Sequence, residues 1–326
     1  MDTKKIGSRT YRFSSPPSIL AYACTGGKKE AEGPLRSEFD MLRDDSCFGQ
    51  NSWEKAESEM QRLTLRRALA KAELAPAEID FVFAGDLLSQ CIASTFGNRE
   101  TNIPFFGVYG ACSTMAESIV LAGMSIDGGY ARTAVAMTSS HFCSAERQFR
   151  FPLEYGGQRA PTAQWTVTGA GALVLGESAK PPYATAFTAG TIVDAGIKDA
   201  GNMGAAMAPA AYDTLLHHFK DTGRKPRYYD LIATGALGKL GAELLSDMLS
   251  KDGYAMGDVY TDCGLLIYDL VEQDVQSGAS GCGCSAAVLE GHKLNKMRVG
   301  KLNRVLCAAT GAMLATVSTQ QGENIP

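Results

Sequence analysis

The fold of this chain is decided by one stretch of sequence, Tyr109-Gly110-Ala111-Cys112-Ser113-Thr114-Met115-Ala116-Glu117. An apolar segment typical of a strand, residues 103–108, precedes it, and a segment typical of a helix, residues 115–126, continues from it. This order places Cys112 on a sharp turn at a helix N-terminus. Unpaired N–H groups and the positive end of the helix dipole favour a thiolate or a bound anion there. The stretch therefore indicates a nucleophilic cysteine or an anion-binding turn.

The composition excludes several classes of protein. The chain has 326 residues, is 45% hydrophobic and carries a formal net charge of −4, with no long basic run, so nucleic-acid binding is not predicted. No apolar stretch reaches the length of about 18 residues that a membrane-spanning helix needs. The polar segment 1–12 lacks the apolar core of a signal peptide. We therefore expect a soluble protein without a leader or a transmembrane segment.

Cysteine usage points to a reducing compartment. The nine cysteines are an odd number scattered through apolar segments, which favours free thiols over a disulfide framework. Cys282 and Cys284 form the only close pair, and Cys263 and His292 could be drawn with them as a zinc site. Their spacing matches no common zinc pattern. The sequence therefore predicts no metal centre.

The pattern of apolar segments predicts an α/β protein with a mostly parallel sheet. Residues 1–50 are predicted to be irregular, and strands and helices alternate after them. Pro181-Pro182 interrupts this order and divides the chain into an N-terminal half, 1–180, and a C-terminal half, 181–326. The predicted helices are 53–74, 113–127, 205–220, 241–250 and 285–299, and the predicted strands are 79–84, 103–108, 131–138, 166–175, 185–193, 229–234, 264–268 and 304–309.

The two halves match each other in sequence, which indicates a duplication. Ala111-Cys112-Ser113 corresponds to Gly283-Cys284-Ser285 at an offset of 172 residues. The same offset relates Gly128 to Gly300, Arg132 to Arg304, Ala136 to Ala308 and Thr138 to Thr310. Upstream, the segment 80–85 corresponds to 230–235 at an offset of 150, so the second half carries an insertion of 22 residues between Gly235 and Cys284.

A duplicated α/β unit with a cysteine at the strand–helix turn of its first copy resembles the thiolase fold, which includes the ketoacyl synthases of fatty-acid synthesis. The resemblance covers the chain from about residue 50 onward. It implies two halves packed as αβαβα layers. It also implies pairing of two copies through the sheet edge near the Cys112 turn, and hence a homodimer.

Several phrases together resemble the stage V sporulation protein AD family of spore-forming bacteria. They are residues 84–88 (AGDLL), 109–114 (YGACST), 138–141 (TSSH), 145–150 (AERQFR), 154–158 (EYGGQ), 207–211 (MAPAA) and 262–268 (DCGLLIY). Members of that family are known as dipicolinic-acid-binding proteins of the spore. The resemblance implies dipicolinic acid as the ligand, alone or as its calcium chelate, and no other cofactor. It also implies membrane subunits of a dipicolinate channel as partners, which would hold the protein at the periphery of the spore inner membrane.

Two turns of the second half decide whether Cys112 could be a catalyst. Condensing enzymes with this fold take a histidine from one turn and a histidine or asparagine from the other. Here the first turn reads Thr234-Gly235-Ala236-Leu237, without a histidine. The second reads Gly281-Cys282-Gly283-Cys284, where ketoacyl synthases of the third class read Gly-Asn. We therefore expect no enzyme and a vestigial nucleophile; the alternative is a condensing enzyme that acts on acyl-CoA or acyl carrier protein through Cys112.

The binding hypothesis needs groups for two carboxylates and a flat ring. The predicted ligand-binding residues are Asp86, Cys112, Ser113, Glu117, His141, Arg147 and Arg150. Each has a structural alternative. Ser113 and Glu117 are residue types that stabilise a helix N-terminus, and His141 could be a buried histidine with satisfied nitrogens. Asp86 could bond only to a loop, and the two arginines could pair with Glu146 or Glu154.

Overall fold

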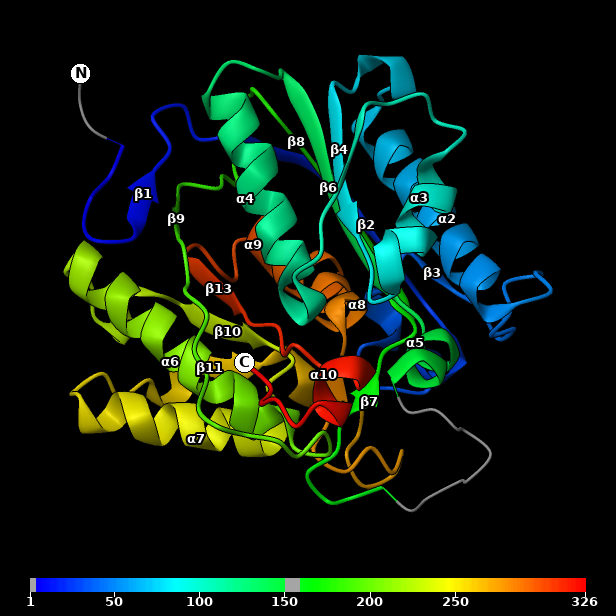
Figure 1. Ribbon diagram of the computed structural model, residues 1–326. Helices are drawn as coiled ribbons and strands as arrows, with labels where there is room; N and C mark the ends of the chain where they lie inside the picture. Colours follow the sequence, from blue (N-terminus) through cyan, green and yellow to red (C-terminus); the bar gives the residue numbers. More distant parts are fainter. Residues whose placement is uncertain (1–3, 150–158) are drawn as a thin grey trace.

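The computed structural model describes residues 4–149 and 159–326, and it places two β-sheets face to face with helices between and outside them (Figure 1). The first sheet has the strand order β3-β2-β8-β6-β4-β5. Its strands are β2 (Ser18–Gly26), β3 (Met41–Leu42), β4 (Phe81–Gly85), β5 (Phe105–Gly107), β6 (Thr133–Ser140) and β8 (Gly169–Gly176). β4 runs parallel to β5 and β6, whereas β8 is antiparallel to both β6 and β2.

The second sheet has the order β11-β10-β13, with all three strands parallel. The strands are β10 (Leu231–Gly235), β11 (Tyr260–Asp262) and β13 (Val305–Ala309). Two short pairs complete the sheet structure: β1 (Thr10–Arg12) with β9 (Ala186–Thr188), and β7 (Trp165–Thr166) with β12 (Ala279–Ser280). The β7–β12 pair joins the end of the first half to the second half.

Five layers follow from how the helices pack. α4 (Thr114–Asp127) and α8 (Cys282–Ala287) lie between the sheets, where apolar side chains of α4 pack against β4 and β8. α2 (Trp53–Ala72) and α3 (Ile92–Asn98) cover the outer face of the first sheet, and α6 (Met203–Thr222) and α7 (Gly238–Lys251) cover that of the second. The remaining helices are α1 (Lys28–Ala31), α5 (Phe142–Phe149), α9 (Leu294–Arg298) and α10 (Thr316–Gln320). The predicted αβαβα arrangement is therefore confirmed.

The duplication is visible in equivalent hydrogen bonds. In the first half, Asp80 Oδ2 accepts from the N–H groups of Arg132 (2.7 Å) and Thr133 (3.1 Å) at the start of β6. In the second half, Asp230 Oδ2 accepts from Asn303 N (2.7 Å) and Arg304 N (2.9 Å) just before β13. In both halves an aspartate that precedes one strand thus fixes the start of its parallel neighbour. The division of the chain at residue 180 stays a prediction.

Three predicted elements differ from the structure. Residues 1–50 are not irregular, because β2 is a nine-residue strand between β3 and β8. The strand predicted at 264–268 is wrong: the strand ends at Asp262, whose side chain accepts from Gly264 N (2.9 Å) and starts a 3₁₀ turn at Cys263–Leu265. The segment 185–193 contributes only β9, which pairs with β1 outside the two large sheets. The helix predicted at 285–299 is present as α8 and α9 joined through a π-helical turn, Val288–Lys293.

Candidate functional site

The Cys112 turn lies between β5 and α4, as the sequence predicts. A single 3₁₀ turn, Ala111–Ser113, precedes α4, and Ala111 takes a left-handed conformation with φ 49°. Ser113 Oγ donates to Gly110 O (2.6 Å), and Thr114 Oγ1 donates to Ala111 O (2.7 Å). The two hydroxyls therefore hold the turn together, which agrees with the structural alternative for Ser113.

The two decisive turns of the second half lie beside Cys112. Ala236 and Cys284 share an apolar cluster with Cys112, and the Gly281 backbone hydrogen-bonds to the Cys112 thiol. Cys282 is fully buried and its thiol donates to Ser139 O (2.9 Å). The fold thus places the two turns of the second half next to Cys112. Neither turn contains a histidine or an asparagine.

Cys112 is not activated by its position. Burial raises the pKa of its thiol to about 11, and the nearby carboxyl of Asp262 adds to the rise; the hydrogen bond from Gly281 opposes it only in part. Among the described residues no cation contributes to this shift. The thiol is therefore protonated at neutral pH, because burial outweighs the helix N-terminus that favours a thiolate. Nucleophilic chemistry would need a base that this turn lacks.

Asp86 is fully buried at the end of β4, and its carboxyl is satisfied by local donors. Oδ1 accepts from Leu88 N (2.8 Å), and Oδ2 accepts from Ser94 N (2.8 Å) and Ser94 Oγ (2.6 Å). These bonds tie the loop after β4 to the start of α3. Burial raises the pKa of Asp86 even though the three bonds stabilise its ionised form.

His141 is also buried, directly after β6. Its Nε2 lies 2.7 Å from Ser46 O, and its Nδ1 accepts from Cys143 N (3.2 Å). With Nε2 as donor, both ring nitrogens are used by the backbone, and burial lowers the pKa of the ring. The side chain is therefore a neutral group that fixes the loop, as its structural alternative predicts.

The predicted cations do not converge on the turn. Arg147 pairs with Glu54 and stacks over the Trp53 ring at 5.1 Å. Glu154, one of the two partners predicted for it, lies outside the described residues. Glu146 instead binds Arg159 (2.9 Å). Glu117 is exposed in the first turn of α4. Arg150 lies outside the described residues.

Sequence reasoning missed a buried polar network behind the turn. Glu57, Gln61 and Thr64 lie at helical spacing on the buried face of α2. Gln61 Nε2 donates to Ser94 Oγ and Ser139 Oγ, both at 2.8 Å. The signal that could have revealed the network is a polar i, i+4, i+7 row inside an otherwise amphipathic helix.

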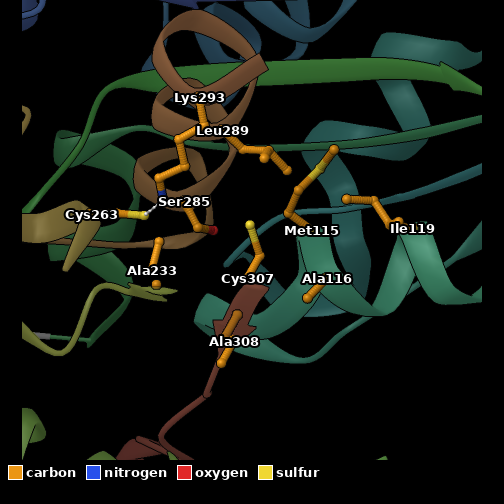
Figure 2. Close-up of a pocket in the computed structure, with 12 residues that line it drawn as sticks. Met115, Ala116, Ile119, Ala233, Cys263, Ser285, Leu289, Lys293, Cys307 and Ala308 are labelled. Atoms are coloured by element: carbon orange, nitrogen blue, oxygen red, sulfur yellow. Dashed lines mark hydrogen bonds between the residues drawn. The ribbon is translucent and has the colours of Figure 1, made fainter. Parts of the chain in front are cut away.

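A small cavity separates α4 from the second sheet (Figure 2). Its volume is about 30 Å³, which suits one water molecule and not a ring with two carboxylates. Its lining is apolar apart from Ser285, Lys293 and two cysteines, and Lys293 Nζ donates to Cys263 Sγ (2.8 Å). The ammonium group of Lys293 at this cavity is thus already hydrogen-bonded within the protein.

Within residues 4–149 and 159–326, no three His, Cys, Asp or Glu side chains gather closely enough to hold a metal ion. All nine cysteines are unpaired. None of the helices described is both long and apolar enough to cross a bilayer.

Comparison with known proteins identifies the family. The family description of stage V sporulation protein AD (SpoVAD) matches residues 7–326. Stage V sporulation protein AD of Bacillus subtilis (strain 168) is 45% identical over 323 residues, which cover 99% of this chain and 95% of that protein. The chain belongs to the SpoVAD family. It is therefore a sporulation protein, as its sequence phrases predict.

Solved structures similar to this SpoVAD-family chain include condensing enzymes. The 3-oxoacyl-[acyl-carrier-protein] synthase III of Aquifex aeolicus VF5 matches with a TM-score of 0.56 and 14% identity, over 90% of this chain and 96% of that one. Cerulenin-bound OleA of Xanthomonas campestris matches with a TM-score of 0.60 and 14% identity, over 92% of this chain and 94% of that one. At this identity the matches concern the fold alone, and they confirm the predicted thiolase-like fold.

Proposed function

We propose that this SpoVAD-family protein binds dipicolinic acid, alone or as its calcium chelate, and performs no chemistry on it. The observation that carries the proposal is the composition of the two turns beside Cys112. The resemblance to condensing enzymes implies a histidine in the first of these turns and a histidine or asparagine in the second, and this chain has Gly235 and Cys282 there. A scaffold that keeps the turn and lacks the proton-transfer groups is suited to hold an acid without making a bond to it.

The N-terminus of α4 would receive one carboxylate of the ligand. The dipole of α4 favours an anion near Cys112, Ser113 and Thr114. The N–H groups of Ser113 and Thr114 donate to Gly110 O and Ala111 O, and they would have to leave these acceptors to bind the ligand directly. Asp86 and His141 would act by holding the loops after β4 and β6, since their polar atoms are already bonded within the protein. Arg147, Arg150 and Glu117 stay predicted ligand contacts.

Equilibrium dialysis against dipicolinate tests this function. We expect saturable binding of one ligand per chain, and we expect Cys112→Ser to retain an affinity within about threefold of the wild type, because no covalent bond is involved. Glu272→Gln, at an exposed position, is the matched control. Absence of saturable binding at millimolar dipicolinate would refute the proposal.

The partners follow from the same proposal. The protein would deliver dipicolinate to membrane subunits of a channel in the developing spore, and it would associate with the spore inner membrane only through those subunits. The acyl-CoA or acyl-carrier-protein condensing enzyme stays the alternative, since the structural neighbours include such enzymes.

A homodimer would form through the free edge of β5. Among the described residues β5 pairs only with β4, and Phe106 stacks on Phe83 (5.0 Å) while half of its side chain is exposed. We expect sedimentation to give a dimer for the wild type and a monomer for Phe106→Lys. Val271→Lys, at a more exposed apolar position away from this edge, should leave the dimer intact. A monomeric wild type, or a dimeric Phe106→Lys, would contradict this interface.

A further inference from the structure

Two acidic side chains are buried together behind the Cys112 turn. Glu57 on α2 is 1% exposed and Asp86 is fully buried, and no ion pair of the described residues reaches either carboxyl. They are joined through side chains, because Ser139 Oγ donates to Glu57 Oε1 (2.8 Å) and Ser94 Oγ donates to Asp86 Oδ2 (2.6 Å). Gln61 Nε2 donates to both serines.

The hydrogen bonds can be satisfied with one proton on this pair. Asp86 receives three donors, which suits an ionised carboxylate. Ser144 Oγ lies 2.7 Å from Glu57 Oε2 and 3.1 Å from His141 O. His141 O also accepts from Ala145 N (3.0 Å), so it does not depend on the Ser144 hydroxyl. Ser144 can therefore donate to an ionised Glu57, or it can accept from a protonated Glu57 Oε2 and donate to His141 O, so the hydrogen bonds accommodate both charge states of Glu57.

The network adjoins the candidate ligand site. Cys282 donates to Ser139 O, and Cys112, Glu57 and Asp86 are each close enough to influence the pKa of the Cys282 thiol. An anion bound at the Cys112 turn would therefore be repelled by the negative charges of Glu57 and Asp86. The neighbouring cation Arg147 is paired with Glu54, and the ring of His141 is neutral.

We propose that binding of an anionic ligand at the Cys112 turn is coupled to uptake of a proton by Glu57. This inference rests on the proposed function and adds its regulation: the buried acid neutralises part of the charge that the ligand brings. The groups that face Glu57 agree with this role. Asp86 beyond β4 and Glu54 on the same helix are acidic, Cys282 on α8 is a buried thiol, and His141 before α5 is neutral.

The pKa of Glu57 in the ligand-free protein determines how the affinity for dipicolinate changes with pH. Burial and the neighbouring Asp86 raise the pKa of Glu57 to about 8, so the side chain is about half ionised at pH 8 without ligand. An anion nearby raises that pKa further, so binding at pH 8 should take up about half a proton per chain. The affinity for dipicolinate should then fall about tenfold between pH 7 and pH 9. As the pH rises, Glu57 is ionised in a growing fraction of free chains, and each of these must bind a proton together with the ligand.

Calorimetry with dipicolinate and no calcium, at pH 8 in Tris and in triethanolamine, measures this uptake. The two buffers release protons with different enthalpies, so the apparent binding enthalpies should differ for the wild type and coincide for Glu57→Gln. Glu59→Gln, which removes the partly buried partner of Arg62 on the same helix, should behave as the wild type. Equal enthalpies in the wild type would overturn the proton coupling and leave ligand binding intact, whereas no heat in either buffer would refute the proposed function itself.

A second measurement guards against failure of Glu57→Gln to fold. Carboxyl-carbon NMR of wild-type protein labelled at glutamate should show one resonance whose chemical shift changes with a midpoint near pH 8. With dipicolinate bound, this midpoint should lie at a higher pH. A midpoint that saturating ligand leaves unchanged would contradict the coupling.

Discussion

Cys112 is expected to stay unmodified when the folded protein is incubated with acyl-CoA at neutral pH. Its pKa of about 11 leaves about one thiolate in several thousand thiols at pH 7.5. A catalytic cysteine with a pKa near 7 would be mostly ionised under the same conditions. We therefore expect iodoacetamide to alkylate Cys112 about a thousandfold more slowly than such a cysteine. Mass spectrometry of the intact chain and of its peptides measures both the acylation of Cys112 and its rate of alkylation.

The protein supplies its own controls for this experiment. Cys307 is exposed and Cys47 is partly exposed, so both should react before Cys112, and all nine cysteines should react once the chain is unfolded in guanidinium. A stoichiometric acyl adduct on Cys112 of the folded protein would contradict the non-enzymatic proposal and favour the condensing enzyme.

Gly85→Ala is expected to destabilise the protein by about 3 kcal/mol, far more than the same change at the equivalent position of the second half. A Cβ atom on Gly85 would overlap Val108 O and lie 2.6 Å from Thr114 Cγ2, on either side of the Cys112 turn. On Gly235 it would meet Ser285 Cβ at 3.0 Å and Ala309 Cβ at 3.2 Å. Small shifts of those side chains can absorb the second contact, so we expect Gly235→Ala to cost about 1 kcal/mol or less.

Urea unfolding of the two variants measures the difference. Because Val108 and Thr114 flank the turn, Gly85→Ala should also weaken dipicolinate binding in whatever fraction stays folded. Equal costs at Gly85 and Gly235 would show that the backbone of the first turn can move, and would contradict the tight packing described here.

The fold was largely predictable from the sequence because its signals are local and repeated. The Cys112 turn, the alternation of strands and helices, and the matching segments around Asp80 and Asp230 each indicate the same duplicated architecture. β2 was missed because its partners, β3 and β8, are set by contacts across the sequence and its small residues give no strong strand signal. The strand predicted at 264–268 failed because the side chain of Asp262 ends the strand early.

The site was less predictable, because its chemistry depends on burial. The sequence places Cys112 at a helix N-terminus, which suggests a low pKa, and only the burial of the thiol, together with the nearby carboxyl of Asp262, reverses that expectation. Likewise, Asp86 and His141 were correctly placed at strand ends. Whether their polar atoms face a ligand or the backbone depends on loops that the sequence pattern does not define.

A crystal structure of the protein with dipicolinate tests the central claim most directly. We predict the ligand at the N-terminus of α4, with one carboxylate at the turn formed by Cys112, Ser113 and Thr114 and with an unmodified Cys112 thiol. Dipicolinate bound elsewhere with this turn empty, or a group covalently attached to Cys112, would contradict the account.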